Sequence, residues 1–223
     1  MRGLFISFEG IDGAGKSTQV GRLARRLKRR GLRVRMTREP GGTQLGEQIR
    51  RLLVERQKLT IAPLAELALM YAARAEHLEE VIRPALRRGE CVLSDRFNAS
   101  SFAYQGHGRG LGEALVRGFD RLVSGRLQPH LTLVLDLNPR LALRRAHARR
   151  ASPSADGFER EGLRFLARVR RGYMSLALAN PARIKLVNAA GKPDEVEAEI
   201  AKVVEDFLRR ESKHRGVRAD RGF

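Results

Sequence analysis

The feature that most constrains the fold of this chain is the segment GIDGAGKS, residues 10–17, which follows a short apolar run. Its Gly10, Gly15, Lys16 and Ser17 match the pattern G-x-x-x-x-G-K-[ST]. Glycines let the backbone curl until successive N–H groups point at phosphate oxygens, and the positive end of the following helix adds to the same field. The segment therefore predicts a strand, a phosphate-binding loop and a helix, in that order.

The residues of this loop suit a nucleoside triphosphate. Lys16 supplies a mobile cation for the β- and γ-phosphates, and the Ser17 hydroxyl can bind Mg²⁺. The predicted nucleotide-binding residues are Gly10, Ile11, Asp12, Gly13, Ala14, Gly15, Lys16, Ser17 and Thr18. A glycine-rich turn that merely leads into a helix is the structural alternative, but the strand before the loop and the helix after it favour a nucleotide site.

Five short runs of β-type sequence alternate with helical segments along the chain. They are Leu4–Phe8, Arg33–Thr37, Cys91–Ser94, Leu131–Leu137 and Ile184–Asn188. This alternation is typical of βα units on a parallel sheet, and nearly continuous apolar runs, such as the first and fourth, are typical of strands covered on both faces. The sequence therefore predicts an α/β fold with a five-stranded parallel sheet flanked by helices.

Two helices can be placed from the spacing of apolar residues. The helix after the loop should bury Val20, Leu23, Ala24 and Leu27 and turn its arginines to water. A longer helix should run from about Pro63 towards Gly89, with a possible bend at Pro84. Its expected core stripe is Leu64, Leu67, Tyr71 and Leu78. Met70 and Arg74 share another face, which could look into a cleft.

Charge is the one extreme bulk property. The 223 residues carry a net charge of +19, which points to nucleic acid, a membrane surface or phosphorylated small molecules as partners. Biased genomic base composition is an equal alternative explanation for the excess of arginine, and residues 22–38 contain no aromatic side chain to stack on bases. No apolar run approaches the roughly 18 residues of a membrane helix. The single Cys91, expected to be buried, excludes an internal disulfide and fits a reducing cytoplasm.

Polar residues follow the second and third β-type runs. Arg38 opens the segment REPGGT, and Asp95 and Arg96 lie in SDRF. Ligands collect at the carboxyl ends of parallel strands, so both arginines should converge on the edge that carries the phosphate loop. Asp95 could hold magnesium or its waters there. Asp136 ends the fourth run, but Asn138 beside Pro139 favours an ordinary helix start at that point.

Five segments in series resemble bacterial thymidylate kinases: GIDGAGKS, TREPGGT, LMYAAR, SDRF and AYQGHGRG. The resemblance covers most of residues 1–208. It implies a three-layer P-loop kinase fold with a small arginine-rich lid, at about residues 140–161. The implied reaction transfers the γ-phosphate of ATP to thymidine monophosphate (dTMP) with Mg²⁺, in a cytoplasmic homodimer that requires neither nucleic acid nor membrane. Residues 209–223 are expected to form a flexible basic tail.

The chemistry of the acceptor is consistent with this reaction. A phosphate monoester has a second pKa of about 6, so it is already dianionic at neutral pH and needs no general base. Cationic groups must instead allow two polyanions to approach in line, and arginine forks do this well. Arg38 and Arg96 are therefore assigned to the acceptor phosphate, and Lys16 with lid arginines to the transferring group. Asp12 matches the position where the family places an acid near the acceptor.

The resemblance also implies which residues bind the acceptor. They are Glu39, Met70, Arg74, Asp95, Arg96, Ser100, Ser101, Tyr104 and Gln105. Arg74 corresponds to an arginine that bonds the thymine edge, and Tyr104 and Gln105 resemble residues that line the deoxyribose and the base. Asp95 is also expected to join Ser17 at the magnesium ion.

Three positions depart from the family pattern. Gly13 stands where one branch of the family has an arginine in the loop, so the transition-state arginine should come from the lid, as Arg149 or Arg150. Gly157 replaces the usual arginine of a D-R-[FI]-E motif, which leaves the choice of lid arginine open. Met70 replaces a phenylalanine that stacks on thymine, and a thioether contacts a ring more weakly.

Two other functions remain open from the sequence. Another nucleoside monophosphate kinase of the same fold, acting on uridylate or adenylate, would share the loop and the arginines. A basic P-loop protein that binds nucleic acid would share the loop and the charge. Five histidines without metal-type spacing argue against a metal-binding module.

Overall fold

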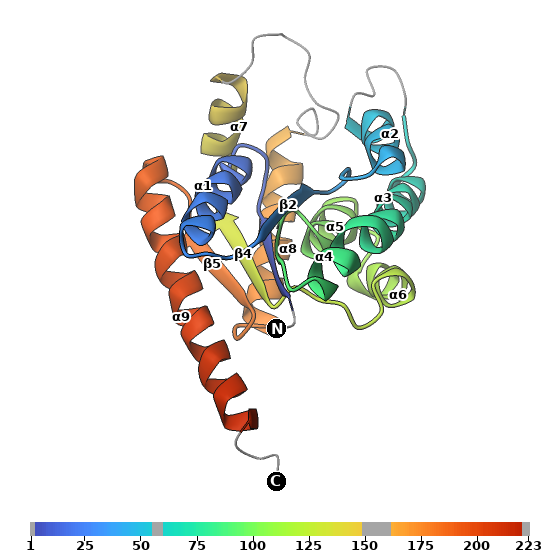
Figure 1. The fold of residues 1–223 in the computed structure, drawn as a ribbon. Coiled ribbons are helices and arrows are strands. Elements are labelled where there is room, and N and C mark those ends of the chain that lie inside the picture. The colour runs from blue at the N-terminus through green and yellow to red at the C-terminus, as the bar shows by residue number, and fades with distance from the viewer. Residues whose placement is uncertain (1–2, 55–59, 149–161, 220–223) are drawn as a thin grey trace.

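The computed structural model describes residues 3–54, 60–148 and 162–219, which are built around one parallel sheet (Figure 1). The five strands are β1 (Leu4–Glu9), β2 (Val34–Arg38), β3 (Cys91–Asp95), β4 (Leu131–Asp136) and β5 (Ile184–Asn188), in the spatial order β2-β3-β1-β4-β5. All five predicted runs are strands, and their ends shift by about one residue. The predicted five-stranded parallel sheet is confirmed.

The register of the strands sets which loops meet. Phe8 of β1 and Arg38 of β2 both pair with Asp95 of β3. The phosphate loop and the segments REPGGT and SDRF therefore leave the sheet at the same level and at the same edge. This edge is where ligands of open parallel sheets bind.

Helices cover both faces of the sheet (Figure 1). They are α1 (Lys16–Arg29), α2 (Gln44–Val54), α3 (Pro63–His77), α4 (Arg83–Arg87), α5 (Asn98–Ser101), α6 (Glu113–Val123), α7 (Pro139–Ala148), α8 (Gly162–Ala179) and α9 (Pro193–Ala219), with two wider π-helical segments, η1 (Leu78–Ile82) and η2 (Phe102–Gly108). Ile6 and Phe8 of β1 join the core cluster that contains the buried stripe of α1, whereas Phe5 packs with Ile82 and Phe97. Side chains therefore pack against both faces of β1, as its continuous apolar sequence requires.

Some of the arginines on and just after α1 form ion pairs with α9. Arg22 forms ion pairs with Asp194 and Glu197, and Arg26 and Arg30 both contact Glu205 at 2.7 Å. The predicted apolar stripe of α1 is fully buried on the opposite side. Part of the arginine excess therefore serves contacts between helices.

The long helix predicted from Pro63 towards Gly89 is confirmed with one correction. The chain runs through α3, η1 and α4 without a break, and Pro84 lies in the first turn of α4. Leu67, Tyr71 and Leu78 are buried, but Leu64 is 52% exposed. The buried stripe begins one turn later than predicted because Leu64 occupies the first, outward-facing turn of α3.

Helix extends into both the predicted lid and the predicted tail. Helix α7 begins just before the predicted lid and continues into it as far as residue 148, and Asn138 caps it by accepting a hydrogen bond from the Arg140 N–H at 2.9 Å. The rest of that region, residues 149–161, lies outside the described residues. Helix α9 continues to Ala219, so its end does not coincide with the boundary predicted at residue 208.

Two composition-based expectations concern Cys91 and the membrane. Cys91 is buried as predicted, and burial raises the pKa of its thiol to about 12. In the described part of the chain, no helix combines the length and the apolar composition of a membrane-spanning segment.

Candidate active site

The phosphate loop takes a conformation that glycine permits and other residues resist. Gly10, Gly13 and Gly15 have φ values of 129°, 87° and 89°. A Cβ atom on Gly13 would lie 2.2 Å from the carbonyl oxygen of Ala142 in α7, and one on Gly10 would lie 2.5 Å from the carbonyl oxygen of Leu135. The family arginine missing at position 13 could not be accommodated here, because α7 packs directly on the loop.

Alanine substitutions at Gly13 and Gly15 should lower the stability of the fold by different amounts. Both have positive φ, but a Cβ atom on Gly15 would meet no described atom within 4 Å. Gly15→Ala should cost about 1 kcal/mol of unfolding free energy from φ alone. Gly13→Ala should cost about 1–3 kcal/mol more, from overpacking against α7. Urea unfolding of the nucleotide-free variants measures both, and equal losses would contradict the packing of α7 on the loop.

Lys16 points back into the curl of the loop. Its Nζ donates a hydrogen bond to the Ile11 carbonyl oxygen at 3.1 Å and lies 3.7 Å from Asp12 Oδ1. Burial and the nearby charge of Arg96 lower the pKa of the ammonium. The cation is thus held against the backbone of the loop.

The structure joins the two predicted magnesium ligands. Ser17 Oγ, in the first turn of α1, donates a hydrogen bond to Asp95 Oδ2, at the end of β3, at 2.5 Å. A hydroxyl and a carboxylate are hard oxygen ligands of the kind that Mg²⁺ prefers, and Mg²⁺ completes its shell with water and substrate phosphates. The pair therefore fits the ion.

Arg96 lies at the centre of the polar network beside the loop. Its guanidinium donates to Asp12 Oδ1 at 2.5 Å and to the Tyr104 hydroxyl, the Gly10 carbonyl oxygen and Ser100 Oγ, each at 3.0 Å. Its φ of 75° is unusual for a residue other than glycine. Backbone strain is retained where surrounding contacts hold it, which happens most often at functional sites.

The charges of this network are fixed. Burial alone would raise the pKa of Asp12, but Arg96 and Lys16 outweigh burial and hold that pKa well below its usual range. Burial likewise raises the pKa of the Tyr104 hydroxyl. At neutral pH Asp12 is therefore an anion beside two cations, and Tyr104 is a neutral donor.

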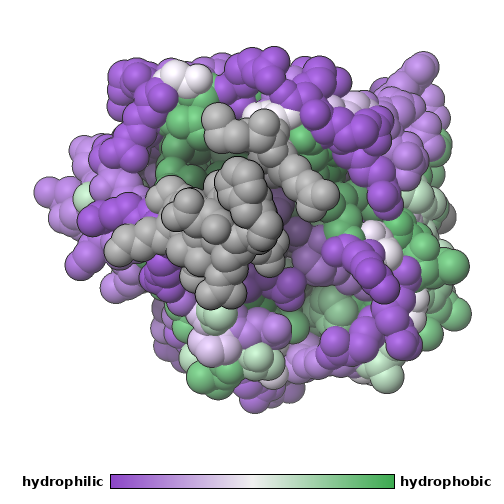
Figure 2. All heavy atoms as spheres, turned by 60° about the horizontal axis from the view of Figure 1, so that its bottom comes forward, coloured by the Kyte–Doolittle hydropathy of each residue, from purple (hydrophilic) through white to green (hydrophobic). Residues whose placement is uncertain are grey.

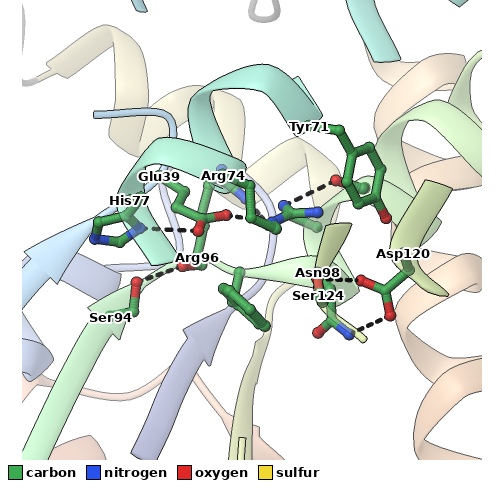
Figure 3. Close-up of polar contacts among 12 residues, drawn as sticks. Glu39, Tyr71, Arg74, His77, Ser94, Arg96, Asn98, Asp120 and Ser124 are labelled. Atoms are coloured by element: carbon green, nitrogen blue, oxygen red, sulfur yellow. Dashed lines mark hydrogen bonds and ion pairs between the residues drawn. The ribbon is translucent and has the colours of Figure 1, made fainter. Parts of the chain in front are cut away.

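Glu39, Arg74 and His77 form a second, fully buried cluster (Figure 3). Glu39 accepts a hydrogen bond from Arg74 Nε at 2.7 Å and contacts His77 Nδ1 at 2.9 Å. Arg74 also donates to Ser101 Oγ at 3.0 Å and lies 4.5 Å from the centre of the Tyr71 ring. Its Nη1 is buried and has no hydrogen-bond partner among the described residues.

Gln105 offers the complementary atom. Its Nε2 donates to Glu66 Oε1 at 2.8 Å, and Arg109 holds the same carboxylate through Nε and Nη2. The Gln105 Oε1 is buried without a hydrogen-bond partner in the described part of the chain. Arg74 thus provides an unpaired donor, and Gln105 an unpaired acceptor.

The family assignment rests on comparison with known proteins. A family model described as thymidylate kinase matches residues 8–200. This chain belongs to the thymidylate kinase family.

Relatives in the thymidylate kinase family match nearly the whole chain. The thymidylate kinase of Pseudomonas syringae pv. tomato is 48% identical over 208 residues, or 93% of this chain and 98% of the relative. That of Deinococcus radiodurans is 50% identical over 199 residues, or 89% and 95%. The crystal structure of thymidylate kinase from Ehrlichia chaffeensis has a TM-score of 0.73 at 34% identity and covers 92% of this chain and 99% of that one. The predicted resemblance and the P-loop kinase fold are confirmed.

Among the residues expected at the thymidylate kinase site, Arg38 and Met70 are placed differently. Arg38 is 53% exposed and forms a two-point ion pair with Glu47 of α2, at 3.3 and 2.9 Å, so its side chain does not join the Arg96 network. Met70 is buried in a small cluster between α2 and α3 with Ile49, Leu53 and Ala73. Ser100 and Ser101 lie on α5, where they contact Arg96 and Arg74, respectively. Arg149 and Arg150 fall outside the described residues.

A pocket of about 680 Å³ opens beside the phosphate loop. Predicted residues Gly13, Ala14, Gly15 and Thr18 line it, together with Gln19, Arg145 of α7 and residues 189–193 after β5. Arg145 donates to the carbonyl oxygens of Ala189 and Ala190 at 2.6 and 2.7 Å. Gln19 and Arg145 were missed from the sequence. The segment after β5 could have been found, because it follows the carboxyl end of a strand.

Glu9 and Tyr173 were also missed. Glu9 ends β1, and its carboxylate accepts hydrogen bonds from the Phe97 N–H at 2.8 Å, Ser100 Oγ at 2.6 Å and the Tyr173 hydroxyl at 3.2 Å. Burial raises the pKa of Glu9 to about 7. The available signal was an acidic residue in an otherwise apolar, buried strand. Tyr173, on α8, had no comparable signal.

Proposed function

We propose that this chain transfers the γ-phosphate of ATP to dTMP, giving ADP and thymidine diphosphate. The observation that best supports this reaction is the position of Arg96. Its guanidinium bonds to the Gly10 carbonyl oxygen of the phosphate loop, and it is held there by Asp12 and Tyr104. A guanidinium beside a triphosphate-binding loop is suited to bind the phosphate of a second substrate.

The donor would occupy the loop and the pocket beside it. The loop N–H groups and Lys16 would hold the phosphates of ATP, with Mg²⁺ bound by Ser17 and Asp95. The pocket of about 680 Å³ next to Gly15 and Thr18 has room for the base and ribose. A bound Mg²⁺ would neutralise charge on the phosphates, and Lys16 would bring a further cation to the transferring group.

The acceptor would lie on the other side of Arg96. Its phosphate is dianionic at neutral pH, so Arg96 has to bind and align a nucleophile that already exists. The thymine edge offers a carbonyl oxygen and a ring N–H. These groups complement the unpaired donor on Arg74 and the unpaired acceptor on Gln105. Glu39 would hold Arg74 for this contact, and Tyr104 would line the sugar.

Met70 would contact the base only if its thioether left the cluster that it forms with Ile49, Leu53 and Ala73. Arg38 would serve the acceptor phosphate only by exchanging its ion pair with Glu47 for the phosphate. Catalysis would thus depend on positioning and on fixed charge. A lid arginine, Arg149 or Arg150, would complete the transferring site.

We also propose that residues 1–208 are a single catalytic domain that acts as a homodimer in the cytoplasm, with residues 209–223 as a flexible tail. Exposed hydrophobic side chains support the dimer: Leu45 and Leu52 on α2, Leu64 on α3, and Leu115 and Leu122 on α6. Figure 2 shows hydrophobic surface on the side where these helices lie in Figure 1. A second copy is the natural cover for such a face, and sedimentation equilibrium tests it.

A panel of monophosphates tests the activity. With ATP and Mg²⁺, dTMP should have the highest kcat/KM of a panel that also contains uridylate, cytidylate and adenylate, with a margin of about 10-fold or more over cytidylate and adenylate. Cytosine reverses the donor and acceptor that face Arg74 and Gln105, and one unpaired buried polar group costs about 1–3 kcal/mol. Comparable turnover of another monophosphate would favour the related kinase of the same fold. No transfer to any of them would sink the proposal.

A further inference from the structure

A second pocket lies beneath α6, remote from the phosphate loop. Its volume is about 290 Å³, and it is lined by α5, α6, the end of α8 and the starts of β4 and β5, including Thr132 and Ile184. The amino ends of the strands are opposite the edge where the proposed substrates would bind. This volume lies near the lower limit for pockets that take small organic ligands, about 300 Å³.

Arginines form the rim of this pocket. Arg117 contacts Glu113 at 3.4 Å, whereas Arg121 and Arg183 form no ion pair with another described residue. Two unpaired guanidiniums at one cavity are a suitable site for a phosphate group. The rim therefore favours an anionic ligand.

Amide and carboxylate groups form the floor. Asp120 is 6% exposed and accepts hydrogen bonds from Asn98 Nδ2 at 3.1 Å, Ser124 Oγ at 2.9 Å and Gln128 Nε2 at 3.0 Å. These groups can bond hydroxyl or amide groups of a ligand but not a second phosphate. The pocket thus fits a molecule that has a phosphate at one end and neutral polar groups at the other.

The floor is connected to the proposed acceptor site. Asn98 follows Arg96 by two positions and begins α5, which carries Ser100 and Ser101. These two serines bond Arg96 and Arg74, respectively. Figure 3 shows the hydrogen bonds of Asp120 with Asn98 and Ser124. The charge of Asp120 is also one of the influences that raise the pKa of Arg74.

We propose that the pocket beneath α6 binds a small organic phosphate, and that its occupancy changes the affinity for the acceptor. A ligand that bonds Asn98 or Asp120 competes with the contacts that hold the start of α5. It thereby favours one placement of Arg96 and Arg74 over another. If the acceptor binds these two placements with different affinity, the two sites are coupled. The coupling rests on the proposed function, whereas the binding does not.

Calorimetry with ribose 5-phosphate tests the binding. The full chain is first saturated with ADP and dTMP, so that the phosphate loop and the acceptor site are occupied, and ribose serves as the phosphate-free control. Ribose 5-phosphate should bind the wild type, and ribose should not. The double variant Arg121→Ala, Arg183→Ala should bind about 10-fold or more weakly, because it lacks two charged hydrogen-bond donors.

Arg126→Ala is the matched control, because Arg126 carries the same charge nearby without lining the pocket. It should bind like the wild type, and thermal unfolding should show that all variants are folded. Equal binding by the double variant and the wild type, or no binding to either, overturns the pocket assignment.

The affinity for dTMP tests the coupling. Its dissociation constant, measured in the presence and absence of ribose 5-phosphate, should change in the wild type and stay constant in the double variant. An unchanged constant in the wild type overturns the coupling. Failure of the chain to bind dTMP at all would instead overturn the proposed function, and ribose 5-phosphate binding to the two proteins would still decide whether the pocket is a site.

Discussion

Replacing Arg96 with alanine should lower kcat by about 100- to 1000-fold, the usual cost of losing one preorganised charged donor at a reacting phosphate. ATP affinity should change by no more than about 3-fold, since Arg96 does not line the pocket beside the loop. Its side-chain contacts with the loop are to the Gly10 carbonyl oxygen and the Asp12 carboxylate, not to the N–H groups and Lys16 that would hold the phosphates of ATP. Steady-state kinetics give kcat, and calorimetry with ATP gives the affinity.

Arg96→Lys provides the control for charge against geometry. Lysine keeps the positive charge but cannot reproduce a fork that bonds Asp12 and Tyr104 together with Gly10 and Ser100. The kcat of Arg96→Lys should therefore lie between that of Arg96→Ala and that of the wild type. If ATP affinity falls as steeply as kcat in the alanine variant, Arg96 acts on the donor and its assignment to the acceptor is wrong.

Glu39→Ala should produce the largest loss of stability, about 3–5 kcal/mol, because it leaves Arg74 buried without a counter-charge. Both side chains of the pair are almost fully inaccessible, at 2% and 0% exposure. His77 loses a partner in the same change. In a chain of this size the thermal midpoint should fall by on the order of 10 °C.

Glu47→Ala is the matched control for Glu39→Ala. Glu47 also pairs with an arginine, Arg38, but both side chains are exposed, at 40% and 53%. Solvent screening leaves such a pair worth about 0–1 kcal/mol. Equal losses in the two variants would show that burial of the Glu39 pair does not matter.

The stability from Glu39 should also depend on pH. Burial alone would raise the pKa of its carboxyl, but Arg74 and His77 together outweigh burial and lower that pKa in the folded chain. A lowered folded-state pKa means that the contribution is complete above the pKa of the unfolded chain, about 4.3, and is lost as the pH falls through the folded value. Glu39→Ala should therefore flatten the decline of stability at acidic pH.

Local pattern was sufficient for much of the fold. The apolar run before Gly10 and the stripe from Val20 to Leu27 predicted β1, the loop and α1, because each depends on residues that are neighbours in sequence. The same holds for Asn138 as the cap of α7. The prediction that Leu64 is buried was wrong, because only the contacts of a helix with its neighbours decide which of its side chains are buried.

Less of the candidate site than of the fold could be predicted from the sequence. Asp12, Ser17, Asp95 and Arg96 could be placed at one edge because strand ends of a parallel sheet meet there. The partner of Arg38 could not be predicted, since a glutamate on α2 competes for it at close range. Nor could Tyr173, whose hydroxyl reaches Glu9 from a residue 164 positions away.

The sequence by itself determined that this chain has a phosphate loop at the end of a buried strand, on a parallel α/β sheet, with arginines at the carboxyl ends of the neighbouring strands. Spacing and residue type are enough for that, since backbone conformation and strand burial follow local pattern. Only the tertiary structure decided which charges pair and which remain available, such as Arg38 with Glu47 and Arg74 with Glu39. Those pairings depend on distances between distant segments, and electrostatic energy changes steeply with distance and burial.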